Sequence, residues 1–296
     1  MNVINMKRDH VVRATAADGT IRAFAVYSRG LVEEARRMHG LSRTATAALG
    51  RTLTAAVMMG TMMKGDKDAL SIVFNGDGPL GNITATVKSD GSVKGYVGNP
   101  EASLPSKVGE KLRVGEVVGK GTLRIIYDLA MREPYSGVVE IQSGEIADDI
   151  AYYLTSSDQI PSAVSLGVLL NEDSSVREAG GFIVQLMDGA TDETAALLEE
   201  RVAALPSMTT MLTEGETPES ILERLLGDMD LQVLEDKPVE FRCDCTRERT
   251  LKLLSLVSAD ELQSMVDEGE DVEMVCAFCN SKYQYSPEEI AALIEG

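Results

Sequence analysis

Four cysteines in the last fifth of the chain carry its most specific chemical signal. They form two close pairs, Cys243 with Cys245 and Cys276 with Cys279, separated by residues 246–275, and the sequence has no other cysteine. The Cys-x-x-Cys spacing of the second pair is typical of a zinc knuckle, in which two thiolates from a tight turn bind one tetrahedral metal ion. The Cys-x-Cys spacing of the first pair is rarer, but its thiolates can still chelate. We therefore predict one zinc ion held by four thiolates.

The purpose of such a zinc ion has three possible interpretations. The ion is purely structural, or Cys276 and Cys279 form a thioredoxin-like dithiol, or zinc holds the thiolates until an oxidant converts them to disulfides. A thioredoxin-like motif lies at the start of a helix that follows a strand. Here the Cys276–Cys279 motif is followed by a second strand-like segment. Disulfides within each pair are sterically conceivable, although a Cys243–Cys245 bridge would be strained and easily reduced.

Residues 237–296, which surround the thiols, are expected to form a small C-terminal domain. Capping-box patterns begin helices at Ser258 and Ser286, and strand-like segments at 272–275 and 283–285 flank the second cysteine pair. A domain of 60 residues rarely has a sufficient core without a metal or a disulfide. Structural zinc contributes roughly 10–16 kcal/mol in small modules, whereas whole domains are stable by about 5–15 kcal/mol. Losing zinc should therefore unfold this domain.

The charge is uneven along the chain. The net charge of the chain is −19. Residues 188–236 include two basic and 13 acidic residues, and residues 237–296 include six basic and 13 acidic residues. A nucleic-acid-binding zinc ribbon needs cations to neutralise phosphates, so the acidity around the thiols argues against a nucleic-acid partner.

The sequence also lacks the signals of a membrane or secreted protein. It has no long apolar run, and no apolar segment follows Lys7 and Arg8. We therefore expect no membrane partner and a cytoplasmic location. There, clustered thiols more often bind metal or respond to oxidants than form permanent disulfides.

Little in the sequence indicates catalysis. The two histidines, His10 and His39, lie in no recognisable catalytic pattern. Residues 76–81 match the dinucleotide-binding fingerprint formally, but residues 82–87 alternate like a strand where the fingerprint requires a helix. We therefore expect no nucleotide site and no enzyme activity.

Residues 1–187 are expected to form an α+β core domain, because strands and helices are mixed without a βαβ rhythm. A helix is predicted at 146–154, with Asp148 and Asp149 on its solvent side, and residues 163–170 and 182–187 are apolar enough for central strands. The other predicted elements are hairpins at 9–28 and 83–97, helices at 31–39 and 42–64, and strands at 72–74, 123–127 and 137–141. Four methionines share a face of the second helix, and we expect core packing rather than an adaptable binding surface: Met58, Met59, Met62 and Met63.

Residues 188–236 are expected to form an acidic helical linker. Thr191 is predicted to cap a helix over 195–205, and Thr217, followed by Pro218, begins another. The second helix carries a thin apolar stripe that includes Leu222, Leu225 and Leu226. Short helices are marginal alone, so the linker needs a neighbour to stay folded.

The chain resembles the redox-regulated 33-kDa heat-shock holdase chaperones of bacteria over essentially its full length. The four cysteines match that family's zinc site in order and spacing, and residues 157–167 (SDQIPSAVSLG) and 179–187 (AGGFIVQLM) agree as well. The resemblance implies an N-terminal α+β core domain, a helical linker and a C-terminal zinc domain. It also implies a reduced, inactive form in which Cys243, Cys245, Cys276 and Cys279 all bind one zinc ion.

The resemblance further implies activation by oxidation. Peroxide with mild heat, or hypochlorous acid, would form Cys243–Cys245 and Cys276–Cys279 disulfides, expel zinc and unfold the C-terminal domain and the linker. The active form, a homodimer, would hold unfolding client proteins against aggregation without ATP. The alternative is a constitutive zinc-stabilised interaction module in transcription or translation.

Overall fold

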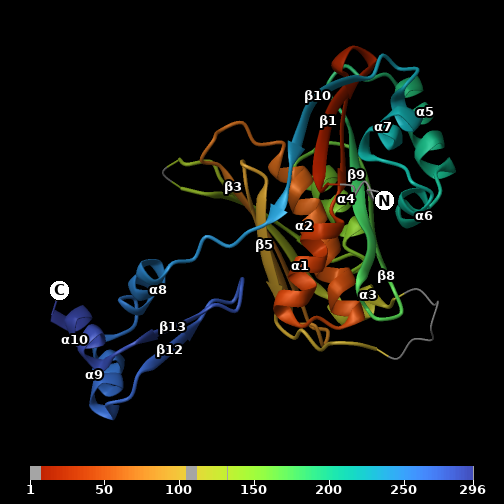
Figure 1. Ribbon diagram of the computed structural model, residues 1–296. Helices are drawn as coiled ribbons and strands as arrows, with labels where there is room; N and C mark the ends of the chain where they lie inside the picture. The colour runs from red at the N-terminus through yellow and green to blue at the C-terminus, as the bar shows by residue number, and fades with distance from the viewer. Residues whose placement is uncertain (1–7, 105–111, 132, 296) are drawn as a thin grey trace, which may run out of the picture. The chain divides into compact units, whose positions relative to one another are not determined.

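The computed structural model describes residues 8–104, 112–131 and 133–295 (Figure 1). Lys7, on which part of the expectation about the N-terminus depends, lies outside these ranges. The chain divides into two compact units, residues 1–242 and 243–296. The first unit contains two sheets and seven α-helices among its described residues, and the second contains a two-stranded sheet and three helices. The expected α+β class is confirmed.

The first sheet has five antiparallel strands in the order β10-β1-β2-β9-β8. The strands are β1 (His10–Ala16), β2 (Ile21–Tyr27), β8 (Ser162–Leu170), β9 (Val176–Leu186) and β10 (Gln232–Pro238). The predicted hairpin of β1 and β2 is confirmed, with Asp18 and Gly19 at positive φ in its turn. The expectation of two central strands is correct for β9 and wrong for β8, which lies at the edge. β8 is apolar because helices pack against it, not because strands flank it on both sides.

The second sheet has six strands in the order β11-β5-β4-β3-β6-β7, and β11 pairs parallel with β5. The strands are β3 (Ala69–Gly76), β4 (Asn82–Lys88), β5 (Ser92–Val97), β6 (Gly121–Asp128), β7 (Tyr135–Glu140) and β11 (Glu240–Phe241). A strand follows the glycine-rich loop at 77–81, as expected. Gly76 is required there because a Cβ atom would lie 1.8 Å from the carbonyl oxygen of Val118, in α3 (Val114–Val118).

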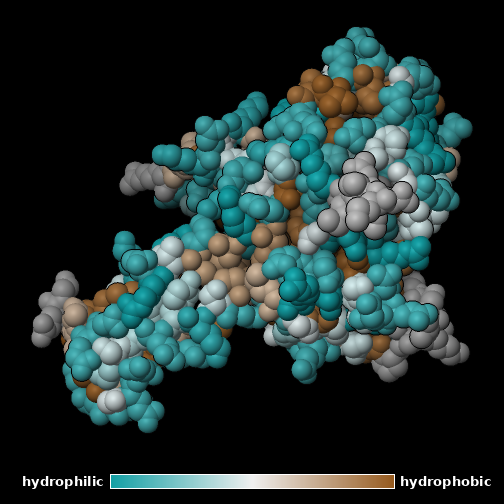
Figure 2. Space-filling view, in the orientation of Figure 1, coloured by the Kyte–Doolittle hydropathy of each residue, from teal (hydrophilic) through white to brown (hydrophobic). Residues whose placement is uncertain are grey.

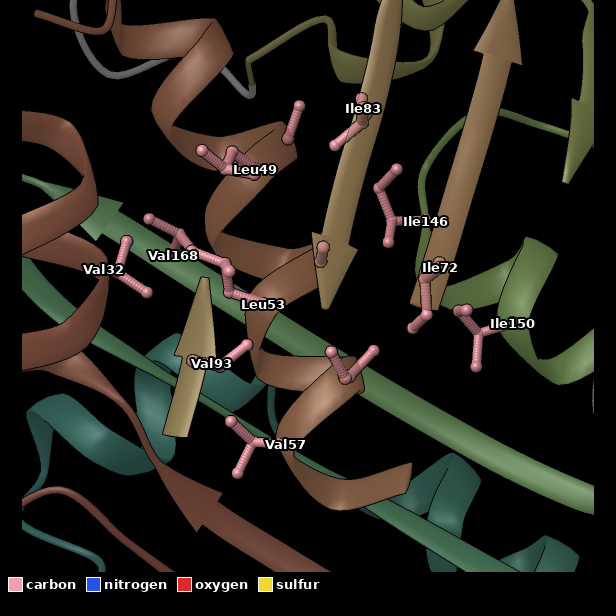
Figure 3. Close-up of a cluster of buried hydrophobic side chains, with 14 of the residues drawn as sticks. Val32, Leu49, Leu53, Val57, Ile72, Ile83, Val93, Ile146, Ile150 and Val168 are labelled. Atoms are coloured by element: carbon pink, nitrogen blue, oxygen red, sulfur yellow. The ribbon is translucent and has the colours of Figure 1, made fainter. Parts of the chain in front are cut away.

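The main core lies around α2 (Arg43–Gly60), which packs against strands of both sheets. Figure 3 shows Leu49, Leu53 and Val57 of this helix among Ile72, Ile83 and Val93 of the second sheet and Val168 of the first. Met58 and Met59 are fully buried, and Met62 and Met63 pack against the same core. The methionines are therefore core residues, as expected.

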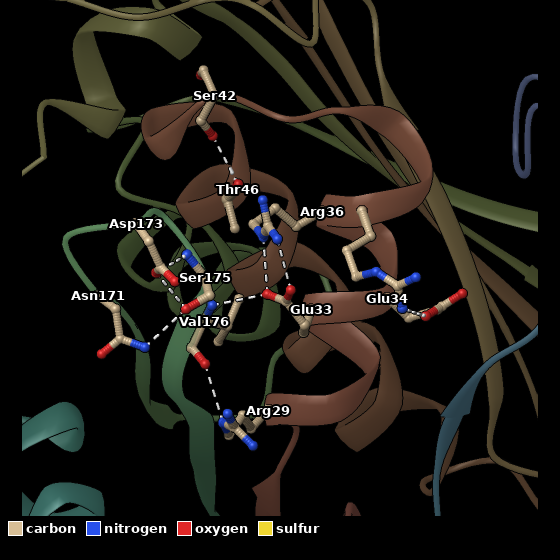
Figure 4. A network of polar contacts seen from close by, with 11 residues as sticks. Arg29, Glu33, Glu34, Arg36, Ser42, Thr46, Asn171, Asp173, Ser175 and Val176 are labelled. Carbon is tan, nitrogen blue, oxygen red and sulfur yellow. Dashed lines mark hydrogen bonds and ion pairs between the residues drawn. The ribbon is translucent and has the colours of Figure 1, made fainter.

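Charged side chains fasten α1 (Arg29–His39) to the turn between β8 and β9 (Figure 4). The Glu33 carboxylate accepts bonds from the Arg36 guanidinium at 2.7 and 2.9 Å and from the Val176 amide at 2.8 Å. The Arg29 Nε atom donates to the Val176 carbonyl at 3.1 Å. Both backbone groups of Val176 are thus bonded to α1, which fixes the helix over this end of the sheet.

Asp149 is fully buried in α4 (Ala147–Ser156), so the expectation that it faces solvent is wrong. Its carboxylate accepts three backbone N–H bonds, from Gln142 at 2.7 Å, Ser143 at 3.0 Å and Ile146 at 3.2 Å. The carboxylate thus satisfies donors of the loop before the helix and of its N-cap residue, Ile146, at a helix end where negative charge is favoured.

The acidic segment packs on the face of the first sheet opposite α2 (Figure 1). It forms α5 (Asp192–Ala204), α6 (Met208–Thr213) and α7 (Pro218–Leu226), and the predicted caps Thr191 and Thr217 both accept backbone N–H bonds. Leu222, Leu225 and Leu226 are fully buried in a cluster with residues of β1, β2 and β9. The sheet face supplies the neighbour that the linker needs. After α7 the chain enters β10, which pairs with β1, so residues 232–236 are strand.

The second unit is small and has little core. It contains α8 (Arg247–Leu254), α9 (Ala259–Glu268), β12 (Val272–Val275), β13 (Lys282–Tyr285) and α10 (Pro287–Glu295), close to the predicted elements. Among its described residues, four hydrophobic side chains are buried in one cluster: Leu254, Leu262, Tyr285 and Ile290. Of the helices described in either unit, none is long and apolar enough to cross a membrane.

Candidate metal centre

The four cysteines come together in the second unit, from two segments far apart in the sequence. Cys243 and Cys245 precede α8, and Cys276 and Cys279 lie in the turn between β12 and β13. All four are free thiols, and all are partly buried. The fold therefore brings together all four residues predicted to form the site.

The sulfur geometry fits a tetrahedral metal site. All four Sγ atoms lie within 4.8 Å of one another, with 3.8 Å between Cys243 and Cys276 and 3.3 Å between Cys245 and Cys279. Sulfurs at zinc–sulfur bond length around a tetrahedral ion lie about 3.8 Å apart. The four thiols can thus hold one metal ion, and soft thiolate ligands select ions such as zinc.

The turn of the second pair is shaped by backbone hydrogen bonds. The Cys276 carbonyl accepts from the amides of Cys279 at 3.3 Å and Asn280 at 2.8 Å, and the Cys276 amide donates to the Ser281 carbonyl at 2.9 Å. Asn280 has a φ of 56°, a left-handed conformation that asparagine tolerates better than most residues. This turn holds the two sulfurs on the same side, as a metal knuckle requires.

Ionisation of the thiols is unequal across the cluster. Burial raises the pKa of both Cys243 and Cys276. Burial also opposes ionisation of Cys279, but hydrogen bonds from the Ser281 side chain and backbone, together with the Cys245 and Cys276 thiols, lower the pKa of Cys279 to about 7. Several thiolates so close together repel one another, so a divalent cation is what allows all four to be charged.

Two hydroxyl groups contact the sulfurs and were not anticipated from the sequence. The Tyr283 hydroxyl lies 3.1 Å from the Cys245 Sγ atom, and the Ser281 hydroxyl lies 3.2 Å from the Cys279 Sγ atom. Their positions in the sequence could have indicated this contact. Ser281 and Tyr283 closely follow the second cysteine pair and flank Lys282, so in an extended segment their side chains point to the same side.

The start of α8 is fixed against the second half of the unit by one arginine. The Arg247 guanidinium forms a bidentate pair with Glu289 at 2.7 and 2.8 Å, donates to the Gln284 carbonyl and lies 4.6 Å from the ring centroid of Tyr285. These contacts lower the pKa of Glu289 to about 2, chiefly through the hydrogen bond from Arg247. They join the segment after the first cysteine pair to the segment after the second.

The chain with this thiol cluster is similar to known proteins over nearly its full length. A family model described as Hsp33 protein matches residues 9–286. The chain belongs to the Hsp33 family. The resemblance inferred from the cysteine spacing is thereby confirmed.

Relatives and a solved structure agree with this family. The 33 kDa chaperonin of Clostridioides difficile is 48% identical, with 97% of this chain and 99% of that protein covered. A 33 kDa chaperonin of Clostridium perfringens is 47% identical, with coverage of 97% and 91%. The crystal structure of the 33 kDa chaperonin (heat shock protein 33 homolog) of Thermotoga maritima superposes with a TM-score of 0.89 at 36% identity and covers 98% of both chains. Membership of this family is consistent with a chaperone role.

Proposed function

We propose that this Hsp33-family protein is a redox-regulated holdase whose four thiols bind one zinc ion in the reduced, inactive form. The observation that carries the proposal is the thiol cluster itself, because free sulfurs from two distant segments lie within 4.8 Å of one another. The unit that holds them has four buried core side chains among its described residues. When bound, zinc would hold the sulfurs as thiolates and cross-link the two segments. We propose three functional parts: a core domain at residues 1–187, a linker at 188–236 and a zinc-binding redox-switch domain at 237–296.

Oxidation is proposed to act on the cysteine pairs that are adjacent in sequence. Cys243 with Cys245, and Cys276 with Cys279, would each form one disulfide, because each sulfur lies within side-chain reach of its partner. Each new bond releases two electrons, which together with two protons from solvent reduce one hydrogen peroxide molecule to two water molecules. Disulfide sulfurs carry no negative charge and cannot hold a divalent cation, so the cross-link between the two segments is lost.

Unfolding of the C-terminal unit is proposed to loosen the linker helices and expose apolar surface. The apolar cluster beneath the linker includes Val12, Tyr27, Phe182 and Val184 of the first sheet, all buried. Figure 2 also shows a hydrophobic patch near the start of β10, where Val233 and Leu234 are exposed. Unfolding clients would bind such surfaces, while the 13 acidic residues of the linker keep the complex dispersed.

The proposal includes a homodimer in the active form, a cytoplasmic location and holding of clients without ATP. It includes no catalytic step, nucleic-acid partner or membrane partner. The net charge of −19 supports the exclusion of nucleic acid, because phosphate binding requires an excess of cations.

Treatment of the reduced, zinc-loaded protein with hydrogen peroxide at raised temperature tests the proposal. Zinc release is followed with a chromophoric chelator, and aggregation of a heat-labile client is followed by light scattering. We expect zinc release and suppressed aggregation to rise together, and a reductant to reverse both. Zinc that stays bound, or zinc that leaves without any gain in holding, would instead indicate a constitutive interaction module.

A further inference from the structure

The two hydroxyls beside the sulfurs contact different cysteine pairs. Ser281 and Tyr283 are two residues apart in the extended segment that enters β13, so their side chains lie on the same side. One reaches Cys279 of the second pair and the other reaches Cys245 of the first. The sulfurs of Cys245 and Cys279 are 3.3 Å apart. Residues 281–283, at the entry to β13, thus present both hydroxyls to the edge of the cluster where Cys245 and Cys279 meet.

Tyr283 has two acceptors on one residue. Its hydroxyl lies 3.1 Å from the Cys245 Sγ atom and 3.2 Å from the Cys245 carbonyl oxygen. A phenol has a single proton to donate, so the two acceptors compete for it. A thiolate is the stronger acceptor, because hydrogen bonds to charged groups are shorter and stronger than those to neutral ones. The hydroxyl therefore turns to the sulfur when Cys245 is a thiolate and to the carbonyl when that charge is gone.

Tyr285 makes a second connection from the same strand, one that does not involve a cysteine. Its hydroxyl donates to the Arg247 carbonyl at 2.8 Å and is hydrogen-bonded to Thr250. Tyr283 and Tyr285 therefore fasten residues 245–250 to β13 at two successive points. The first point depends on the charge of a sulfur, and the second does not.

We propose that Tyr283 is a positioning residue that couples the charge on the Cys245 sulfur to the docking of residues 245–250 on β13. The inference rests on the proposed function, in which Cys245 is a thiolate in the reduced form. Loss of that charge removes the stronger of the two Tyr283 contacts and leaves Cys245 attached to the strand only by the weaker hydrogen bond to its carbonyl oxygen. The start of α8 is then held by the contacts of Arg247 and Tyr285. Tyr283 is thus a point at which loss of the sulfur charge weakens the attachment of this segment to β13.

The test compares Tyr283→Phe with Tyr285→Phe in the full-length reduced protein. Both variants keep the aromatic ring and lose one hydroxyl, but only Tyr283 contacts a sulfur. Cobalt(II) bound in place of zinc reports directly on the thiolates through its sulfur-to-metal charge-transfer absorption. A hydrogen bond to sulfur lowers the energy of the sulfur lone pair, so its removal should move this absorption to longer wavelength in Y283F and leave it in place in Y285F.

Metal affinity and cysteine reactivity provide further readouts. Loss of a group that orients a metal ligand typically weakens affinity by about 10–100-fold, and we expect a loss of about tenfold for zinc in Y283F. Alkylation of Cys245 by iodoacetamide, followed by mass spectrometry, should be faster in Y283F than in Y285F. Ser281→Ala, which removes the hydroxyl beside Cys279, should also move the cobalt absorption but leave the Cys245 alkylation rate unchanged.

Two results would overturn the assignment of Tyr283. One is a cobalt absorption in Y283F that coincides with that of the unsubstituted protein while S281A is displaced. The other is an equal displacement in Y283F and Y285F, which would reduce Tyr283 to a general structural role. All of these measurements use reduced protein without oxidant or client. Failure of the proposed holdase activity would therefore be seen separately from failure of this inference.

Discussion

At the scale of single residues, buried acceptors determine where the backbone of this protein turns. Asp149 accepts three N–H bonds at the start of α4, and one of the donors, Ile146, has a φ of 67°. A β-branched residue in the left-handed region is strained, so surrounding contacts must hold it there. The Asp149 carboxylate is one such contact, because it bonds to the Ile146 amide directly.

We predict that Asp149→Asn lowers the free energy of unfolding by about 1–3 kcal/mol, since at least one buried N–H donor loses its partner. Chemical denaturation followed by circular dichroism measures the change. Asp148→Asn is the matched control, because the Asp148 side chain is exposed. This substitution should change the free energy of unfolding by about 0.5 kcal/mol or less. Equal effects of the two substitutions would contradict the buried role of Asp149.

Asp9 supplies a second, partly buried carboxylate, and its contribution should depend on pH. Asp9 directly precedes β1. Its carboxylate accepts hydrogen bonds from two amides in the first turn of α1, Gly30 at 2.9 Å and Leu31 at 2.5 Å. Burial raises the pKa of Asp9, and the two backbone hydrogen bonds only partly offset this effect. The folded state therefore binds the Asp9 proton more tightly than the unfolded state does, and raising the pH through the folded pKa removes stability.

Comparison of the unsubstituted protein with Asp9→Asn between pH 4 and pH 7 checks this sign. We expect the stability of the unsubstituted protein, relative to D9N, to be greatest near pH 4 and to fall as the pH rises. Denaturant midpoints at each pH, with the m-value monitored, give the difference. A relative stability that rises with pH would mean that the hydrogen bonds outweigh burial.

At the scale of elements, local patterns in the sequence identified most helices and strands but not their surroundings. Hairpin turns and the caps Thr191 and Thr217 are local signals, and each was read correctly. The cysteine spacing is also a local signal, and the four thiols that it singled out do lie close together. The edge position of β8 and the burial of Asp149 depend on which distant segments pack against them. The contact between Tyr283 and Cys245 spans 38 residues and depends on two segments meeting, so no local pattern could reveal it.

The linker helices offer a prediction at this scale. Replacing Leu222, Leu225 and Leu226 by Ser should loosen α7 from the first sheet, because all three side chains are fully buried there. The reduced variant should bind an apolar dye that the unsubstituted protein excludes. We also propose that these leucines contact clients once α7 is released, so the oxidised variant should hold fewer clients.

Leu197→Ser is the control, because Leu197 is a partly exposed leucine of α5. It should leave both dye binding and client holding close to those of the unsubstituted protein. Client holding by the triple variant that equals the unsubstituted protein would remove the linker leucines from the client-binding surface.

At the scale of the whole molecule, the two units differ greatly in the packing that supports them. The first unit has two large hydrophobic clusters on opposite faces of its five-stranded sheet, whereas the described residues of the second have one cluster with four buried members. A metal ion bound by the four thiols would add stability comparable to that of an entire domain, roughly 10–16 kcal/mol. The second unit should therefore depend on the metal, and the first should not.

Metal removal under reducing conditions separates this dependence from disulfide formation. A strong chelator with excess reductant should abolish hydrogen-exchange protection in α8, α9 and β13, while α2 and β9 stay protected because their core needs no metal. Restoring zinc should restore protection in the second unit.

The hydrogen-exchange protection of α7 shows how far the effect of metal removal spreads. Protection lost in α7 on chelation alone would mean that unfolding of the second unit is sufficient to release the linker. Protection retained in α7 until oxidant is added would mean that the linker responds to a further signal. Persisting protection in α8 and β13 without metal would contradict the role of the thiol cluster as the main support of the second unit.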